Sequence, residues 1–320
     1  MSTILRRITM AVAASMVVFG ALIPVAHAAT SSATAHPAPP QTRWAVNHSS
    51  AQAVRSYWTP QRLAAAKPAP LPPRPRTAEV TGSPSGTPRA IHATRPAGSA
   101  GGAQPNSSVW TTVGRLFFHN PADGGTYVCT ANIVTSNNRD VIATARHCVM
   151  DIATGTWFTD FQFAPSYDRG NAPYGWWTWR SAGVRVDDTS PGGDNAFIVL
   201  NAGGNGGAHV QDAIGSSGIG FNVSTNNYAH AIGIPANLDY AVWCEGTPVD
   251  SYNGGVHIPN CQGLSGGASG GPFIFNYASD GSAMQTATYF GSWGSGTDGN
   301  SYFAYYRDAS LDVYNGAQNA

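Results

Sequence analysis

Two serines in a glycine-rich run are the residues of this chain best suited to act as nucleophiles. The run covers residues 263–273 and reads GLSGGASGGPF, so that Ser265 and Ser269 each stand in a G-x-S-x-G arrangement. A nucleophilic serine needs a tight turn that exposes its oxygen, and neighbouring glycines let backbone N–H groups face a substrate carbonyl. A Gly-Ser turn between two strands uses the same residues, so a base and a carboxylate elsewhere in the chain must separate the two interpretations.

A histidine and an aspartate stand where they could complete such a site. His147 follows an apolar segment and directly precedes Cys148, within ATARHCV (143–149). Asp194 opens the apolar run DNAFIVL (194–200), so its carboxylate would lie at the mouth of a buried strand. A serine activated by a histidine that a carboxylate orients is the arrangement that acyl-transfer hydrolases use.

Other residues of the same types are weaker candidates for these roles. No comparable apolar run directly follows Asp187 or Asp188, and aspartates are common in turns. All nine histidines precede Ser265, whereas in the nucleophile elbow of α/β-hydrolases the histidine follows the serine. Four more histidines are interpreted as structural: His119, His209, His230 and His257.

Short β-strands are the elements that must position these residues. From residue 109 onward, β-rich runs alternate with Gly, Asn and Asp turns, which is typical of an antiparallel all-β fold. The expected strands are 113–119, 127–135, 140–145, 156–163, 176–186, 196–200, 229–234, 240–245, 272–276, 286–292 and 301–306. Only the stretch 309–316 is expected to be helical. Two consecutive groups of strands predict two packed six-stranded antiparallel β-barrels, at about 109–205 and 206–306, within a domain 109–320.

The charge balance divides the chain into two parts. Seventeen basic and 17 acidic residues cancel, which argues against a strongly electrostatic nucleic-acid binder. Residues 1–108 hold 10 Lys and Arg and a single Glu, whereas residues 109–320 hold 7 Arg and 16 Asp and Glu. The chain is 42% hydrophobic and has nine Trp, so it can bury a sizeable core. We expect the two parts to have different fates.

The first 28 residues have the pattern of a signal peptide. Arg6 and Arg7 precede an apolar run, 8–25, and the residues 26–28 (AHA) form a small-residue cleavage site. An uncleaved membrane anchor is the alternative interpretation. No other stretch approaches the ~18 apolar residues that a membrane-spanning helix needs. The mature protein is therefore expected to be secreted and extracellular, with no membrane contact after signal cleavage.

The next part of the chain, 29–108, is rich in proline and alanine. It contains 13 of the 22 prolines, a composition that buries little surface and favours extended conformations. One island, 54–66, carries aromatic and aliphatic residues that could dock on another surface. Two hypotheses remain open. The tract is either a secretion linker with a chance amphipathic piece, or a basic pro-segment that lies on the acidic domain and is removed after export.

All four cysteines fall within the expected β domain. They allow three pairings, and in an exported chain disulfides are favoured over a metal site. No C-x-x-C spacing of a structural zinc site occurs, so no metal is expected. We pair Cys129 with Cys148 and Cys244 with Cys261, and each bridge closes a loop of about 18–20 residues, worth roughly 3 kcal/mol. The first bridge would also hold the loop that carries His147.

Taken together, these motifs resemble those of the chymotrypsin-like (trypsin-fold) serine endopeptidases. His147 stands in T-A-x-H-C, Asp194 in D-x-A-x-x-x-L and Ser269 in G-x-S-G-G-P, in the family's order. Further on, residues 292–294 (SWG) match the family's segment that lines the substrate cleft. The resemblance covers roughly residues 109–315 and is nearest to the bacterial secreted branch that includes glutamyl-endopeptidase-like enzymes.

The resemblance implies a role for each matched residue. Ser269 would attack the peptide carbonyl, His147 would take up and later donate its proton, and Asp194 would orient His147. The backbone N–H groups of Gly267 and Ser269 would form the oxyanion hole. Only Ser269 is followed by Gly-Gly-Pro and an apolar strand, so Ser265 is not expected to be the nucleophile.

Several expectations about partners follow from the resemblance. The substrates would be proteins or peptides, the pro-segment would be an intramolecular partner, the chain would be a monomer, and no cofactor or nucleic acid would be needed. Two alternatives of other classes are a catalytically silent binding module with the protease fold and an exported esterase or other acyl hydrolase. Labelling of the serine, and a comparison of casein with short esters, would separate the three.

Two positions near the proposed site depart from the family pattern. Ala268 stands where trypsin-like zymogens keep an aspartate, so the oxyanion hole is expected to form without a buried α-ammonium group. Arg146 replaces a small residue before the histidine and is expected to face outward, because a guanidinium aimed at His147 would disfavour imidazolium.

The substrate-binding candidates are Gly263, Ser292, Trp293 and Gly294. Gly263 lies at the position of the family's Lys- or Arg-selecting aspartate, and Gly291 at the position of the histidine that glutamyl endopeptidases use. Neither glycine supplies a charge, so a roomy neutral pocket for apolar side chains is expected.

Overall fold

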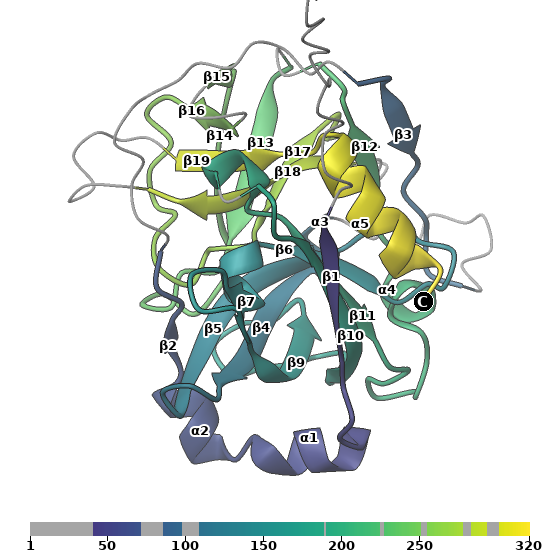
Figure 1. Ribbon diagram of the computed structural model, residues 1–320, viewed down its shortest axis with the longest axis vertical. Coiled ribbons are helices and arrows are strands. Elements are labelled where there is room, and N and C mark those ends of the chain that lie inside the picture. Colours follow the sequence, from purple (N-terminus) through teal and green to yellow (C-terminus); the bar gives the residue numbers. More distant parts are fainter. Residues whose placement is uncertain are drawn as a thin grey trace, which may run out of the picture. The chain divides into compact units, whose positions relative to one another are not determined.

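The computed structural model describes residues 41–71, 86–97, 109–188, 190–224, 227–250, 255–277, 283–292 and 301–320 (Figure 1). All of them belong to one unit of the chain, 40–320. The predicted signal peptide, 1–28, lies outside the described residues. No helix in the described part of the chain is long and apolar enough to cross a membrane.

Six antiparallel strands close into a barrel in the first half of the domain. Their order around the barrel is β10 (Trp177–Arg185), β11 (Ala196–Leu200), β6 (Val141–Thr144), β5 (Gly125–Ile133), β4 (Val113–Asn120) and β9 (Thr159–Pro165), and β9 pairs with β10 to close the ring. A barrel of this size has room only for side chains. Buried apolar side chains, including Leu116, Phe161 and Trp177, fill it. The short strands β7 (Met150–Asp151) and β8 (Thr156–Trp157) form a separate hairpin.

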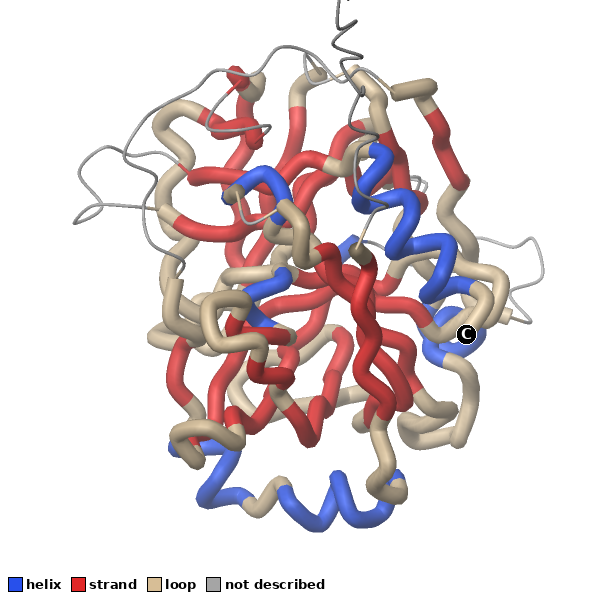
Figure 2. Tube along the Cα trace, in the orientation of Figure 1, coloured by secondary structure: helices blue, strands red, loops and turns tan. Residues whose placement is uncertain are grey.

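The second half of the domain is built on another sheet. Its strand order is β14 (Val242–Gly246), β13 (Ala229–Gly233), β17 (Pro272–Phe275), β18 (Met284–Gly291), β19 (Ser301–Tyr305), β16 (Gly255–Ile258) and β15 (Val249–Asp250). Strand β12 (Gly218–Phe221) runs parallel to β18, and every other pairing in this sheet is antiparallel. Figure 2 shows strands (red) making up both halves, with few helices (blue).

The C-terminal helix holds the two sheets together. Helix α5 (Asp308–Gln318) packs against β10, β11 and β12. Its Tyr314 ring lies 5.6 Å from that of Phe197 on β11 and 5.2 Å from that of Phe221 on β12. The prediction of an all-β fold with a short C-terminal helix is therefore confirmed, and the helix is slightly longer than expected. Of the two expected six-stranded barrels, the first is a closed barrel, whereas the second half is a sheet in which no pairing between described strands closes a ring.

Several short elements were not expected from the sequence. They are the strands β12 and β16, the helices α3 (Val109–Thr112) and α4 (Val210–Ile214), and the 3-10 turns η1 (Arg146–Cys148) and η2 (Pro191–Gly193). Each has three to five residues, which is too short to show a clear hydrophobic period. Of these, η1 matters most, because it carries His147.

The described residues upstream of Val109 contribute structure to the same unit. Helices α1 (Ala51–Tyr57) and α2 (Pro60–Ala65) lie at the lower end of Figure 1, and the strands β1 (Thr42–Val46), β2 (Lys67–Pro68) and β3 (Arg89–Ile91) pair with β10, β5 and β12. Residues 51–57 and 60–65 are thus helical and not extended, and the island 54–66 docks on the domain, as the sequence allowed.

The helices α1 and α2 have start signals that the sequence shows. Ser50 caps α1 by accepting a hydrogen bond from the Ala53 N–H, and Thr59 caps α2 in the same way, with Pro60 as its first residue. Side chains of Val54 and Trp58 are buried, and Trp58 Nε1 donates to the Asp160 carbonyl at 2.6 Å. A capped helix with an apolar face is the physical reason why residues 54–66 dock.

Candidate active site

His147 and Asp194 are brought together by two neighbouring strands of the first barrel. Strand β6 ends just before His147, and its antiparallel neighbour β11 begins just after Asp194, with Thr144 opposite Ala196. His147 Nδ1 lies 2.6 Å from Asp194 Oδ2, and the His147 backbone N–H donates to Asp194 Oδ1 at 2.9 Å. Both carboxylate oxygens therefore hold the histidine, once by its ring and once by its backbone.

The Asp194 carboxylate is buried yet ionised. Burial is the largest influence and raises the pKa of Asp194, but the charge of His147, its two hydrogen bonds and the nearby Arg146 together lower that pKa below its ordinary value. An ionised carboxylate can only accept, so Nδ1 of His147 must carry the proton that is shared. In the neutral ring the lone pair is then on Nε2, the atom that faces away from Asp194.

Arg146 does not face outward as expected. Its side chain is almost fully buried and donates to the backbone carbonyls of Arg185, Asp188 and Ser190. Because three carbonyls satisfy the guanidinium, it is held against the loop before Asp194 and can be tolerated beside His147. Asp188 accepts from the Ser190 N–H and Asp187 pairs with Arg185, so both carboxylates of the alternative candidates have other partners.

Ser269 reaches the same region from the second sheet. It precedes β17, and its carbonyl accepts a hydrogen bond from the Thr130 N–H of β5 at 2.7 Å. The next residue, Gly270, has φ +85°, and a Cβ there would lie 2.1 Å from both the Thr130 carbonyl and Thr144 Oγ1. Only glycine fits this contact. It lets the serine turn pack directly on β5 and on the end of β6, near His147.

Three buried polar side-chain atoms of this region lack a hydrogen-bond partner among the described residues. One is Arg115 Nε, and the two that could take part in the chemistry are His147 Nε2 and Ser269 Oγ. Leaving a buried polar group unpaired costs about 1–3 kcal/mol. His147 Nε2 is an acceptor in the tautomer that Asp194 imposes, and the Ser269 hydroxyl is a donor. The two groups are therefore complementary as hydrogen-bond partners.

In the turn before Ser269, the backbone carbonyls are hydrogen-bonded to neighbouring parts of the protein. The Gly266 carbonyl accepts from the Ala236 N–H at 2.8 Å, and the Gly267 carbonyl accepts from Thr130 Oγ1 at 3.0 Å and from Arg115 at 3.5 Å. Gly267 has φ +97°, which glycine adopts without strain. In the described part of the chain, neither the Gly267 nor the Ser269 N–H donates a hydrogen bond. Two N–H groups are thus left for an oxyanion.

Arg115 is a residue of this site that the sequence analysis missed. Its side chain is 1% exposed and ion-paired with Asp239 at 2.8 Å, and it also donates to the carbonyls of Ile234 and Pro235. Burial lowers the pKa of Arg115, and the hydrogen bond and charge of Asp239 oppose that change. The available signal was a single charged residue within the apolar run 113–118. Ala268 is fully buried and has no carboxylate that could pair with an α-ammonium group.

The remaining candidates are placed as follows. Ser265 is exposed, and its hydroxyl bonds to Asn237 Oδ1 at 3.2 Å, away from any histidine contact that the structure shows. Gly263 has φ +94° and open space where a Cβ would project. Ser292 is half-buried and donates to the Leu264 carbonyl at 3.4 Å. Trp293 and Gly294 lie outside the described residues.

Both expected disulfides, Cys129–Cys148 and Cys244–Cys261, are present. Cys129, Cys148 and His147 lie close enough together to suggest a metal site, but the two sulfurs are bonded to each other and offer no thiolate.

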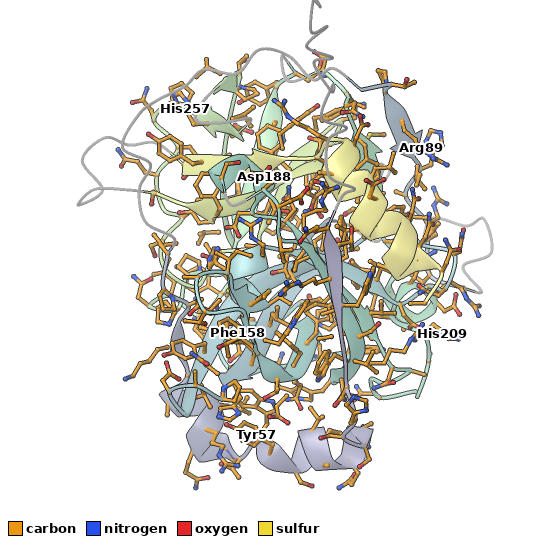
Figure 3. The ribbon with its side chains drawn as sticks, viewed as in Figure 1. Tyr57, Arg89, Phe158, Asp188, His209 and His257 are labelled. Carbon is orange, nitrogen blue, oxygen red and sulfur yellow. A yellow bond between two sulfur atoms is a disulfide. The ribbon has the colours of Figure 1, made fainter. Side chains whose placement is uncertain are left out.

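The histidines interpreted as structural have contacts of their own. His209 pairs with Asp140 and His230 with Glu245, while His119 lies 3.5 Å from Asp160. In Figure 3, His209 lies beside the first barrel and His257 in the second sheet.

Comparison with known proteins agrees with this geometry. No protein-family model matches the chain, and no curated protein is significantly similar to it in sequence. Among solved structures, the thermostable serine protease AL20 from an extremophilic microorganism is 30% identical, over 66% of this chain and 98% of the other, with a TM-score of 0.58. The protease Anisep from Arthrobacter nicotinovorans is 31% identical, over 68% and 99%, with a TM-score of 0.59.

A more distant structure shares the fold alone. A Glu endopeptidase in complex with MPD is 13% identical, over 72% of this chain and 98% of the other, with a TM-score of 0.53. The barrel, the second sheet and the two relatives at about 30% identity point to the same assignment. The chain therefore belongs to the chymotrypsin-like serine proteases.

Proposed function

We propose that the protein is a secreted serine endopeptidase in which Ser269, His147 and Asp194 cleave peptide bonds of protein substrates. The observation that carries the proposal is the buried His147–Asp194 pair, whose free Nε2 and the unpaired Ser269 hydroxyl are buried in the same region. The two disulfides support an oxidising, extracellular location. A silent binding module would not need this buried, costly arrangement.

The chemistry follows from the atoms that are left without partners. Ser269 Oγ forms a bond to the peptide carbonyl carbon while its proton passes to His147 Nε2. The carbonyl oxygen takes up the negative charge and faces the N–H groups of Gly267 and Ser269. When the carbon–nitrogen bond breaks, the leaving amine takes the proton from Nε2, and an acyl-enzyme remains.

Hydrolysis of the acyl-enzyme repeats the same proton transfers. A water molecule attacks the ester carbonyl and gives its proton to Nε2, and the Ser269 oxygen then leaves with that proton. The peptide acid is released and the hydroxyl is restored. Asp194 stays ionised throughout and stabilises the imidazolium, in line with the lowered pKa of its carboxyl.

Covalent labelling of the serine tests this proposal. On prolonged incubation, we expect a fluorophosphonate to label the purified protein at Ser269, Ser265→Ala to be labelled at the same rate, and Ser269→Ala not to be labelled. Casein hydrolysis should follow the same pattern, because loss of the nucleophile in subtilisin costs about 10⁶ in turnover. A Ser269→Ala protein that keeps a tenth of the rate would assign the reaction to another residue.

A further inference from the structure

A short stretch upstream of the domain lies against the proposed active site. Lys67 and Pro68, the two residues of β2, run parallel to Tyr127 and Val128 of β5. The Ala69 N–H donates to the Val128 carbonyl at 3.2 Å, and Ala69 is only 3% exposed. Val128 directly precedes Cys129 and Thr130, so this pairing takes place at the edge of the site.

The same stretch then crosses to the second sheet. A Cβ on Gly266, next to the proposed oxyanion hole, would lie 2.9 Å from the Pro68 side chain. A Cβ on Gly291, at the end of β18, would lie 3.0 Å from the Leu71 side chain. The Cα atoms of residues 67 and 71 lie at most about 14 Å apart when the chain is extended. Residues 67–71 therefore pass from β5, over the turn before Ser269, to the residue that precedes Ser292.

Sheet pairing and apolar burial hold this stretch in place. Upstream of it, β1 pairs with β10 over five residues, and Val54 is fully buried in a cluster shared with Phe117 and Ile232. In the described part of the chain, no ion pair joins residues 41–71 to the domain. In the described residues, direct ion pairs are thus not what holds this segment in place.

We propose that residues 67–71 occupy the peptide-binding cleft as an intramolecular inhibitor, with Leu71 in the subsite beside Gly291. The inference rests on the proposed function and names both the regulation of the site and the class of side chain that this subsite takes, which is apolar and uncharged. The enzyme is then latent until this segment leaves the cleft.

The segment is also poorly suited to be cleaved. Its sequence from residue 67 to 73 is KPAPLPP, so every peptide bond in it involves a proline. In a bond that precedes proline, the leaving nitrogen is part of the ring, which fixes φ and removes the N–H group. A segment of this composition can therefore remain in a cleft without being consumed.

A single buried alanine gives the sharpest test in the full-length chain. Ala69→Arg places a long charged side chain where 3% of the alanine is exposed, and we expect it to displace the segment. The matched control is Ala65→Arg, at an exposed position of α2. Hydrolysis of a chromogenic peptide ending in leucine, and fluorophosphonate labelling, should rise at least tenfold in Ala69→Arg and remain unchanged in Ala65→Arg. Equal rates in all three proteins would overturn the inhibition but leave the proposed function intact.

A second variant and a second measurement keep the test independent of folding and of catalysis. Leu71→Asp changes a side chain that is already 37% exposed, so the fold should tolerate it, and activity should again rise. In the full-length Ser269→Ala chain, hydrogen exchange of the Ala69 amide should be slow, because this N–H is bonded to Val128. Exchange at the rate of an unstructured peptide would overturn the proposal. A protected Ala69 amide, with no labelling in any variant, would instead refute the proposed function alone.

Discussion

Thr130 links the turn before Ser269, the proposed nucleophile, to the first barrel through a single hydroxyl. Neighbouring side chains of a strand point to opposite faces, so Cys129 and Ala131 enter the barrel core while Thr130 faces the second sheet. Its Oγ1 accepts from the Ile234 N–H at 2.9 Å and donates to the Gly267 carbonyl at 3.0 Å. We expect Thr130→Val, which keeps the shape and removes the hydroxyl, to misalign the oxyanion hole.

The expected effect of Thr130→Val on stability and on kcat follows from the two backbone groups that lose their hydrogen-bond partner. Thr130 is fully buried, so the Ile234 N–H is left unpaired without access to water, and the Gly267 carbonyl keeps only the 3.5 Å contact with Arg115. At about 1–3 kcal/mol for each buried unpaired group, the free energy of unfolding should fall by about 2–6 kcal/mol, toward the lower end because the Gly267 carbonyl keeps its contact with Arg115. Removing an oxyanion donor outright costs about 10²–10³ in kcat, so a displaced donor should cost about tenfold or more.

The assay separates this positioning role from a general loss of stability. Urea unfolding gives the change in stability, and steady-state kinetics on protein quantified by active-site titration give kcat and KM separately. We expect kcat to fall and KM to change little, because the Gly267 N–H acts mainly in the transition state. Thr130→Ser keeps the hydroxyl and should retain most of kcat. A Thr130→Val enzyme with unchanged kcat, whatever its stability, would refute the reasoning.

Three further predictions concern the His147–Asp194 pair and the first disulfide. Asp194→Asn should lower kcat by about 10⁴, as the corresponding change does in trypsin, with little change in KM; a loss below tenfold would remove Asp194 from the mechanism. The pKa of Asp194 is lower in the folded state than its ordinary 3.8, so its contribution to stability is complete above that value and is lost as the pH falls through the folded pKa. Below about pH 4, the free energy of unfolding measured with urea should therefore fall more steeply with pH for the wild type than for Asp194→Asn. Parallel curves of this free energy against pH would contradict the lowered pKa. Replacing Cys129 and Cys148 together by serine should lower the free energy of unfolding by about 3 kcal/mol, measured by urea unfolding, and an unchanged midpoint would argue against the bridge.

Much of the fold could be predicted from the sequence, because short stretches of residues are enough to indicate its strands. Strands such as β4 and β11 are runs of apolar residues bounded by turns, and the expected and observed bounds of β11 are the same, Ala196–Leu200. Elements of three to five residues, such as η1 and β12, were missed because such short stretches cannot display a hydrophobic period. The helices α1 and α2 were missed although Ser50, Thr59 and Pro60 are recognisable start signals.

The residues of the candidate site likewise fall into those that could be predicted from the sequence and those that could not. His147, Asp194 and Ser269 stand in motifs of a few residues, so they could be selected from the sequence and its resemblance to a family. Arg146 was expected outside and is buried, because the carbonyls that accept its protons come from residues 39 to 44 positions away in the chain. A local pattern cannot show such partners.

The sequence by itself therefore determined the candidates for the proposed chemistry: a serine, a histidine and a carboxylate in recognisable turns, carried on short strands and held by two predictable disulfides. Only the tertiary structure decided what holds and what covers that chemistry. Thr130 contacts Gly267 across 137 positions of the chain, and Pro68 packs on Gly266 from even further away. Contacts of this kind depend on how two sheets and an upstream segment pack, and packing is a property of the whole fold and not of any window of residues.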